Sequence, residues 1–157
     1  MLQRPLVLLS VLLSVACAST TMTPRANTRT AIESYVEGAA RLVASNGAAA
    51  CDTFKQPAWF EGEWYIFMSE ENGALVCHPA RPDMVGMPQS DIVDPNGKRI
   101  GEEFMRAAAS PAGSGWVEYV WARPGQTAPV AKSAYVRRVV GSDGKVYIVG
   151  SGGYEVR

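Results

Sequence analysis

The sequence is poor in the residues that build most catalytic and metal centres. Its 157 residues include one histidine, His78, and three cysteines. These soft ligands show no closely spaced pair of the kind that structural zinc sites use. No nucleophile or second acid accompanies His78, and a lone histidine before a proline is more often structural than catalytic. We therefore expect no enzymatic activity, no cofactor and no metal.

An excess of one charge is missing as well. The chain has 15 Lys and Arg residues against 15 Asp and Glu residues, so its formal net charge is zero. Neither a basic patch nor a run of like charges interrupts this balance. The charge pattern argues against nucleic acid as a partner and against electrostatic binding to a membrane surface.

Long apolar runs are confined to the N-terminus. Residues 1–18, MLQRPLVLLSVLLSVACA, combine an early positive charge at Arg4, an apolar stretch and small residues at the end. That is the layout of a signal peptide, and the stretch is shorter than the roughly 20 apolar residues that span a bilayer. We expect an exported, periplasmic protein with a polar tether over 19–27 and one domain over 28–157.

Two processing routes remain open for this signal peptide. The motif Ala16-Cys17-Ala18 fits the small-x-small pattern of the ordinary signal peptidase, which would release a soluble protein. The segment LSVAC also resembles a bacterial lipobox. In that case Cys17 would carry lipid and would anchor the chain to the membrane without spanning it.

Two cysteines, Cys51 and Cys77, remain after the signal peptide is removed. In an oxidising compartment such a pair is predicted to form a disulfide. Closing a loop of this size would stabilise the fold by about 3 to 4 kcal/mol in the chain-entropy model. Two buried free thiols are the alternative.

The first regular element after the tether is predicted to be a long helix. Apolar residues recur at three- and four-residue spacing over 32–43, so one stripe of the helix is apolar. Thr30-x-x-Glu33 predicts a capping box at its start, and Asn46-Gly47 predicts its end. The stripe suits either packing within the chain or a homodimer formed through this helix.

The remainder of the chain is predicted to form five strands with one helical insertion. After the first two strands, which Asn72-Gly73 joins in a hairpin, a loop over 79–97 leads into a helix over 98–110. Strands linked by hairpins form antiparallel sheets, so the fold class is α+β, with helices covering one face or one edge of the sheet. The predicted strands are 63–69, 74–79, 115–123, 130–140 and 145–156.

Three segments together resemble a known family. They are GEWYIFMSEENGALVCHPARPDMVG, DPNGKRIGEEFMRAAASPAGSGWVEYVWARPG and PVAKSAYVRRV, in this order along the chain. They resemble the single Cache domain, an extracytoplasmic sensor module, and the likeness extends from about Thr28 to Tyr154. The resemblance implies a long N-terminal helix packed on a PAS-like, five-stranded antiparallel sheet, with a loop-helix insertion after the second strand.

The same resemblance implies a function. It places a small-molecule pocket, typically for a small carboxylate, between the sheet and residues 79–109. Cache domains usually lie between two membrane helices of a chemoreceptor or sensor kinase, whereas this chain ends at Arg157 directly after its last strand. We therefore expect either that a signal passes through a membrane receptor or kinase partner, or that the protein only binds or buffers its ligand.

A carboxylate in such a pocket needs a cation and hydrogen-bond donors. The resemblance implies that Lys132 faces the pocket, and Tyr119 and Tyr135 can each supply an aromatic wall with a hydroxyl donor. Trp121 shares a strand face with Tyr119, and this face either lines the pocket or is plain core. The alternative for Lys132 is a lysine that reaches solvent along the sheet or protects an edge strand. Because Lys132 and Tyr135 are three residues apart, a bulge is needed for both to line one pocket.

Four further residues are candidates for the pocket wall. His78 either lines the pocket or makes a structural hydrogen bond, and Arg81 reaches either a ligand carboxylate or its neighbour Asp83. Tyr65 and Phe67 alternate on the first strand and share either the pocket side or the plain core.

The alternative to a binding protein is an envelope-associated structural lipoprotein without a ligand. It predicts an interior filled by Met84, Met87, Met105 and aromatic residues, and a Lys132 side chain that points to solvent.

Overall fold

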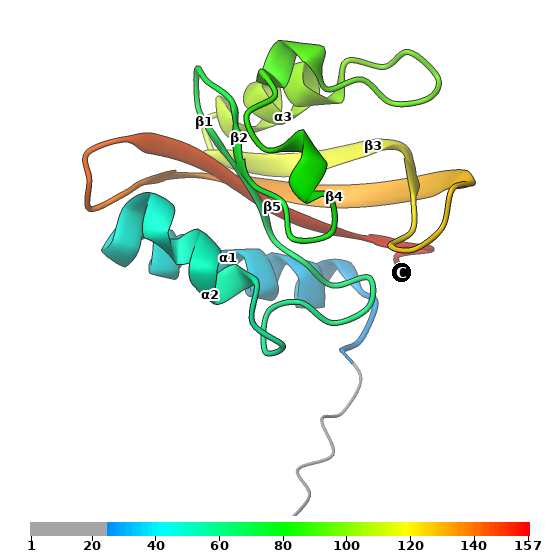
Figure 1. Cartoon of the computed structure of the whole chain (residues 1–157), viewed down its shortest axis with the longest axis horizontal. Helices are drawn as coiled ribbons and strands as arrows, with labels where there is room; N and C mark the ends of the chain where they lie inside the picture. The colour runs from blue at the N-terminus through cyan, green and yellow to red at the C-terminus, as the bar shows by residue number, and fades with distance from the viewer. Residues whose placement is uncertain (1–24) are drawn as a thin grey trace, which may run out of the picture.

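Residues 25–157 are described by a computed structural model. The signal peptide expected over 1–18, the lipidation expected at Cys17 and most of the tether expected over 19–27 lie outside the described residues. Figure 1 shows the arrangement of the rest, a twisted sheet with helices on both of its faces.

The regular elements follow the predicted order. The α-helices are α1 (Arg29–Asn46), α2 (Ala50–Phe54) and α3 (Ile100–Ala108). The strands are β1 (Phe67–Glu70), β2 (Leu75–Cys77), β3 (Ser114–Ala122), β4 (Pro129–Val140) and β5 (Val146–Tyr154). Short 3-10 turns η1 (Gly47–Ala49), η2 (Pro82–Met84) and η3 (Gln89–Asp91) complete the list.

The five strands form one antiparallel sheet in the order β2-β1-β5-β4-β3. The last three strands are long and pair without interruption over their full length. This confirms the α+β class and the five-stranded Cache-like sheet.

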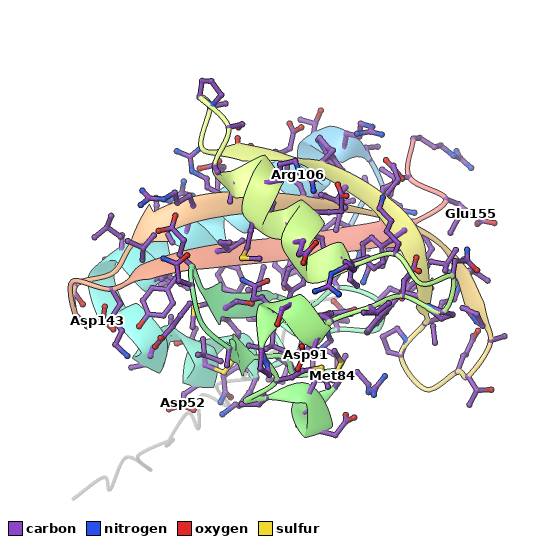
Figure 2. The ribbon with its side chains drawn as sticks, turned by 90° about the horizontal axis from the view of Figure 1, so that it is seen from above. Asp52, Met84, Asp91, Arg106, Asp143 and Glu155 are labelled. Carbon is purple, nitrogen blue, oxygen red and sulfur yellow. A yellow bond between two sulfur atoms is a disulfide. The ribbon has the colours of Figure 1, made fainter. Side chains whose placement is uncertain are left out.

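The helices cover both faces of the sheet, which corrects the expectation of a single covered face or edge. The α1 side holds a core that includes Val43, Phe54 and Tyr147, whereas the α3 side holds a second core that includes Phe67, Phe104 and Ile148. In Figure 1, α1 and α2 lie below the sheet and α3 lies above it. Figure 2, seen from above, shows α3, which carries Arg106, beside the loop that carries Met84 and Asp91.

The start of α1 differs from the predicted capping box. Thr28 is the N-cap, and its hydroxyl accepts a hydrogen bond from the Ala31 amide at 3.2 Å. Thr30 already lies inside the helix, and the Glu33 carboxylate instead accepts from the Trp116 indole at 2.8 Å. The end is as predicted, because Gly47 adopts a φ of 55° directly after Asn46.

The first strand is shorter than predicted. Residues 63–66 precede the ladder, which begins at Phe67, because Glu61 and Trp64 form a tight bridged turn just before it. The second strand ends at Cys77, before His78 and Pro79. Tyr65 and His78 therefore lie just outside the ladder, where their side chains approach the α3-side core.

A disulfide joins Cys51 of α2 to Cys77 of β2, as predicted, with 5.6 Å between their Cα atoms. It ties the α1-side helices to an edge strand of the sheet.

The edge strand at the other side of the sheet, β3, is held by hydrogen bonds to a residue of the 79–97 loop. The buried carboxylate of Asp94 accepts hydrogen bonds from the amides of Asn96 and Lys98 in its own turn and from the Val120 amide of β3.

Candidate functional site

Three side chains form a row across neighbouring strands on the α3 side. Lys132 of β4 is in register with Tyr119 of β3 and with Tyr154 of β5. Residues in register on antiparallel strands share one face of the sheet. The ring of Tyr119 meets Phe104 of α3 at 5.6 Å between centroids, so this face is the one that α3 covers. The sheet thus places a lysine between two tyrosines inside the protein.

Lys132 is 1% exposed. Its Nζ donates a hydrogen bond to Tyr65 Oη at 2.6 Å and lies 4.4 Å from the ring centroid of Tyr65 and 5.1 Å from that of Tyr154. None of the ion pairs within residues 25–157 involves Lys132, and the carboxylate of nearby Glu63 is bound by Arg123. Within the described residues its polar partner is therefore a neutral hydroxyl, and two tyrosine rings lie against it.

This environment destabilises the charged form of Lys132. Burial lowers the pKa of Lys132 to about 7, although the charge of Glu63 partly opposes the shift. Burial also raises the pKa of Tyr65 far above its ordinary value, so its hydroxyl stays protonated. An anion placed beside Nζ would supply the counter-charge that the described residues do not provide.

His78 lies beside the same tyrosine. It is 7% exposed, and its ring centroid is 4.9 Å from that of Tyr65 and 6.3 Å from that of Phe67. Burial first, and then the charges of Lys132 and Arg81, lower the pKa of His78 to about 3, so the imidazole is neutral. Its Nδ1 atom is buried and has no hydrogen-bond partner within the part of the chain that the structure describes.

A small cavity of about 20 Å³ lies among the sheet, the 79–97 loop and α3. Its walls are mainly apolar, with polar groups from Ser69, His78 and Tyr119, and none of the lining residues is acidic. A cavity of this size holds roughly one or two water molecules. The lining residues are Phe67, Ser69, Leu75, His78, Met84, Ile92, Ile100, Phe104, Tyr119 and Trp121.

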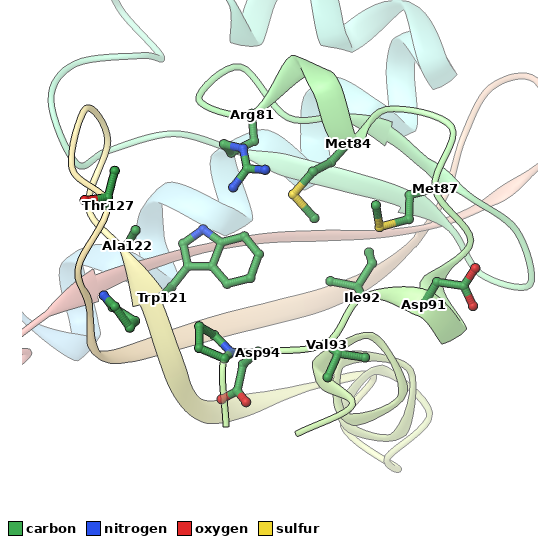
Figure 3. A pocket seen from close by; sticks show the side chains of 12 residues that line it. Arg81, Met84, Met87, Asp91, Ile92, Val93, Asp94, Trp121, Ala122 and Thr127 are labelled. Carbon is green, nitrogen blue, oxygen red and sulfur yellow. The ribbon is translucent and has the colours of Figure 1, made fainter. Parts of the chain in front are cut away.

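Trp121 lies between this inner cavity and the solvent, and Met84 and Ile92 line both the cavity and the open groove beside it. Trp121 also lines a second hollow of about 60 Å³ beside Tyr65 and the open groove of about 400 Å³ between the 79–97 loop and the β3–β4 turn. Figure 3 shows its indole in the middle of the groove, facing Arg81 and Met84. A movement of this half-buried indole would join the three spaces.

Arg81 lies at the rim and is already paired. Its guanidinium donates two hydrogen bonds to the Asp83 carboxylate, at 2.9 and 2.7 Å, and its side chain is 48% exposed. Of the two partners considered for it, the structure shows Asp83. Arg81 still borders the open groove and the second hollow.

Tyr135 does not join the cluster. The β4 strand pairs with both neighbours without a bulge, so the alternation of side chains is unbroken and Tyr135 lies on the α1 side. Its ring is 5.5 Å from that of Trp116, and it borders a surface hollow with Glu33 and Arg41 of α1. Its predicted place beside Lys132 required a bulge that this strand does not have.

Tyr154 is a member of the cluster that the sequence did not single out. Its hydroxyl donates to the Ala122 carbonyl at 2.7 Å, and the guanidinium of Arg123 lies 4.6 Å from its ring centroid. Its position next to Lys132 depends on the register of β4 with β5, which no local pattern specifies. The other predicted residues, Tyr65, Phe67, His78, Tyr119 and Trp121, lie around the row and the cavity.

The described residues show neither a metal centre nor a membrane span. No group of three His, Cys, Asp or Glu side chains in residues 25–157 is arranged to hold a metal ion. Over the same residues, no helix combines the length and the apolar character needed to cross a bilayer.

Comparison with known proteins identifies this arrangement. The profile of the family described as Single Cache domain 2 matches residues 23–155. The chain belongs to this family. Cache domains are extracytoplasmic sensor domains that bind ligands, and the buried row and cavity lie in the half of this Cache domain formed by the sheet, the 79–97 loop and α3.

Individual relatives agree with the family match. The methyl-accepting chemotaxis protein McpP of Pseudomonas putida is 32% identical over 78 residues, which cover 50% of this chain and 14% of that much longer receptor. A periplasmic sensor domain of a chemotaxis protein superposes with a TM-score of 0.67 at 29% identity, covering 78% of this chain and 92% of that one. A Cache chemosensory domain solved to explain carboxylic acid recognition superposes with a TM-score of 0.58 at 29% identity, covering 68% and 69% of the two chains.

Proposed function

We propose that this Cache domain binds a small monocarboxylate in the space between the sheet and residues 79–109, with Lys132 as the cation that receives the carboxylate. The inner cavity of about 20 Å³ is too small for such an acid and Lys132 does not line it, so the proposal includes an outward movement of the Trp121 indole, which joins the cavity to the two hollows beside it. The observation that carries the proposal is the ammonium of Lys132, which is 1% exposed and unpaired with any acid of the described chain. Burying an amine whose charge no described acid balances is costly, and an anion beside it would reduce this cost. The carboxylic acid recognition described for the related Cache chemosensory domain supports this ligand class.

The charges around the cavity favour one carboxylate over other ligand classes. A dicarboxylate needs a second free cation, but Arg81 is held by Asp83 and Arg123 by Glu63. An amine or amino acid needs an acidic partner, and no residue that lines the inner cavity is acidic. A short monocarboxylate needs only one cation, Lys132, and apolar walls, so it is the ligand class that these charges favour.

The structural alternative, a lipoprotein without a ligand, requires Lys132 to point to solvent. Lys132 instead points into the core and contacts Tyr65. The methionines do contribute to packing, since Met84 is buried and Met87 and Met105 lie against the α3-side core. The buried lysine therefore favours the binding function over the structural one.

A signal from the site needs a recipient, and we propose a membrane receptor or kinase in that role. The McpP receptor that shares part of this sequence supports the association with chemotaxis. We further propose that the exported chain is held at the membrane by lipid on Cys17 or is released into the periplasm by cleavage after Ala18.

A titration of the purified protein with sodium acetate, propanoate, succinate and ethylammonium chloride tests the ligand class. At 100 times its dissociation constant a ligand stabilises the native state by about 2.7 kcal/mol, which a thermal unfolding experiment resolves. We expect stabilisation by a monocarboxylate that is lost in Lys132→Met and kept in Lys55→Met, a control at an exposed lysine that pairs with Asp52. Equal stabilisation of both variants would refute Lys132 as the receiving cation.

A further inference from the structure

A cluster of aromatic rings on the α1 side of the sheet takes no part in the proposed function. The ring of Tyr35 in α1 stacks on that of Trp59 with 5.1 Å between their centroids, and it stands nearly perpendicular to the ring of Trp64 at 5.3 Å. The Tyr35 hydroxyl donates a hydrogen bond to the Trp59 carbonyl, and Trp59 packs against Phe54 of α2 at 5.3 Å. We call Tyr35, Trp59 and Trp64 the aromatic cage. A helix and the turn before β1 hold its rings in place.

The cage already holds a cation, the guanidinium of Arg25. Its central carbon, Cζ, lies 4.6 Å from the ring centroid of Tyr35 and 5.7 Å from that of Trp64. One nitrogen, Nη2, donates a hydrogen bond to the Ala58 carbonyl. A guanidinium within about 6 Å of a tyrosine or tryptophan ring is attracted by the negative face of that ring. Two rings and a carbonyl oxygen therefore form a receptor for a guanidinium group.

The hold on Arg25 is incomplete. Its Nη1 atom is buried and has no hydrogen-bond partner in residues 25–157, and none of the ion pairs formed by these residues includes Arg25. Arg25 also precedes the first helix and lies in no regular element. A segment outside helices and strands, with few contacts, opens at a low free-energy cost. Arg25 can therefore leave the cage while the domain stays folded.

Asn27 limits how far this opening extends. Its side-chain amide donates a hydrogen bond to the Tyr154 carbonyl, and its own carbonyl accepts one from the Arg157 amide at 3.1 Å. These bonds keep the start of α1, and with it the ring of Tyr35, in position when Arg25 moves away. The empty cage thus keeps the shape in which it binds a guanidinium.

We propose that the aromatic cage is a second ligand site, which takes a small guanidinium compound, and that Arg25 is an exchangeable plug in this site. A free compound can turn until it also places the donor that Arg25 leaves unpaired, so it replaces the plug without loss of contacts. The cage lies on the α1 side of the sheet, whereas the row that includes Lys132 lies on the α3 side. The two sites share no residue, so this proposal does not rest on carboxylate binding.

Titration of the purified protein with ethylguanidinium chloride, followed by proton–nitrogen correlation spectra of the tryptophan indoles, tests the site. The chain has four tryptophans. The indole signals of Trp59 and Trp64 should shift, whereas those of Trp116 and Trp121, which lie outside the cage, should stay in place. Ethylammonium chloride at the same concentrations controls for salt, and it should bind more weakly because an ammonium is more strongly hydrated than a guanidinium.

Arg25→Ala removes the plug. A plug lowers the apparent affinity by the fraction of molecules whose cage is empty, so this variant should bind ethylguanidinium at least about tenfold more tightly than the wild-type protein. Arg29→Ala is the matched control, because Arg29 also lies over an aromatic ring, that of Trp116, at 4.4 Å. Its loss should leave the dissociation constant unchanged. Arg25→Ala/Tyr35→Leu, which lacks one ring of the cage, should lose the gain, and an unchanged Trp121 signal should show that it is folded.

Four results would overturn the proposal. Equal affinity of the wild-type protein and Arg25→Ala would mean that Arg25 does not block the cage. Binding by Arg25→Ala alone, with none by the wild-type protein at any concentration that leaves it folded, would mean that Arg25 is a permanent anchor. Equal shifts of all four indole signals would mean that binding is not confined to the cage. If neither protein binds ethylguanidinium, the cage is not a ligand site.

Discussion

Lys132 Nζ lies 2.6 Å from Tyr65 Oη, and these two atoms come from residues 67 positions apart in the chain. The contact closes the row of side chains on the α3 side, because Tyr65, two residues before β1, covers the lysine. It gives the ammonium one neutral acceptor, which compensates only part of the cost of burial. The stability and the binding behaviour of the domain should both depend on this incompletely compensated charge.

The first prediction concerns stability and its pH dependence. The pKa of Lys132 is lowered to about 7 in the folded protein from 10.5, so the unfolded chain binds more protons between these two values. Stability should therefore rise with pH from about 7 to about 9, approaching 1.4 kcal/mol per pH unit, the slope for one proton. Nearer pH 10 the buried tyrosines, among them Tyr65 and Tyr119, oppose this rise, because burial raises their pKa values whereas the tyrosines of the unfolded chain ionise. Urea unfolding midpoints measured across this range test the slope.

Lys132→Met provides the comparison for this slope. Methionine fills a similar volume without a charge, so the variant should lose the pH-dependent increase and should match or exceed the wild-type stability at neutral pH. Lys55→Met, at an exposed position, should keep the increase. A wild-type protein whose unfolding free energy is flat over this range would mean that Lys132 is charged in the fold at all these pH values.

The second prediction concerns the pH dependence of carboxylate binding. A carboxylate beside Nζ favours the protonated lysine and raises its pKa, so binding above about pH 7 must take up a proton. The affinity should be nearly constant below about pH 6.5 and should fall up to tenfold per pH unit above about pH 7.5. Titration calorimetry at about pH 8.5, in buffers of different ionisation enthalpy, should show an uptake close to one proton. Binding without any uptake at this pH would contradict the prediction.

The sequence predicted the elements and their order well, because local patterns specify them. Apolar spacing marks α1, and alternation over 115–123 places Tyr119 and Trp121 on one face of β3. The Cache resemblance added the sheet and the position of Lys132. These features depend on periodicity and on the order of segments, both of which are visible in a linear chain.

The site was less predictable, because it depends on register and on contacts between distant segments. Tyr135 was placed with Lys132 although their spacing of three points to opposite faces of an unbulged strand, and the structure follows the spacing. Tyr154 joins the row only through the pairing of β5 with β4. The first strand was predicted to begin at Glu63, but its pairing begins at Phe67, because a turn bridged between Glu61 and Trp64 precedes it. No propensity pattern in the sequence indicated this turn.

The third prediction concerns the disulfide between Cys51 and Cys77. These residues are 26 positions apart, and closing a loop of that length should stabilise the fold by about 3.5 kcal/mol in the chain-entropy model. Wild-type protein treated with dithiothreitol should lose this amount in urea unfolding. The Cys51→Ser/Cys77→Ser variant should have the lower stability already and should not respond to the reductant. A variant as stable as the oxidised protein would show that the bond contributes little beyond the packing of α2.

The last prediction concerns Trp121 as the wall between the inner cavity and the solvent groove. The inner cavity of about 20 Å³ is too small for a ring, and the groove of about 400 Å³ is not. Trp121→Ala should join these spaces, so the variant should bind benzoate, which the wild-type protein excludes, and should release propanoate faster.

Trp116→Ala is the matched control for this prediction. Trp116 is a half-buried tryptophan of the same strand, but it faces α1, where its indole donates to Glu33. Its removal should cost stability of a similar size, about 2 kcal/mol for a half-buried indole, without changing which acids bind. Calorimetric titration of both variants with benzoate and propanoate separates the two effects. If the two variants bind benzoate alike, or neither does, the indole of Trp121 does not set the size limit of the site.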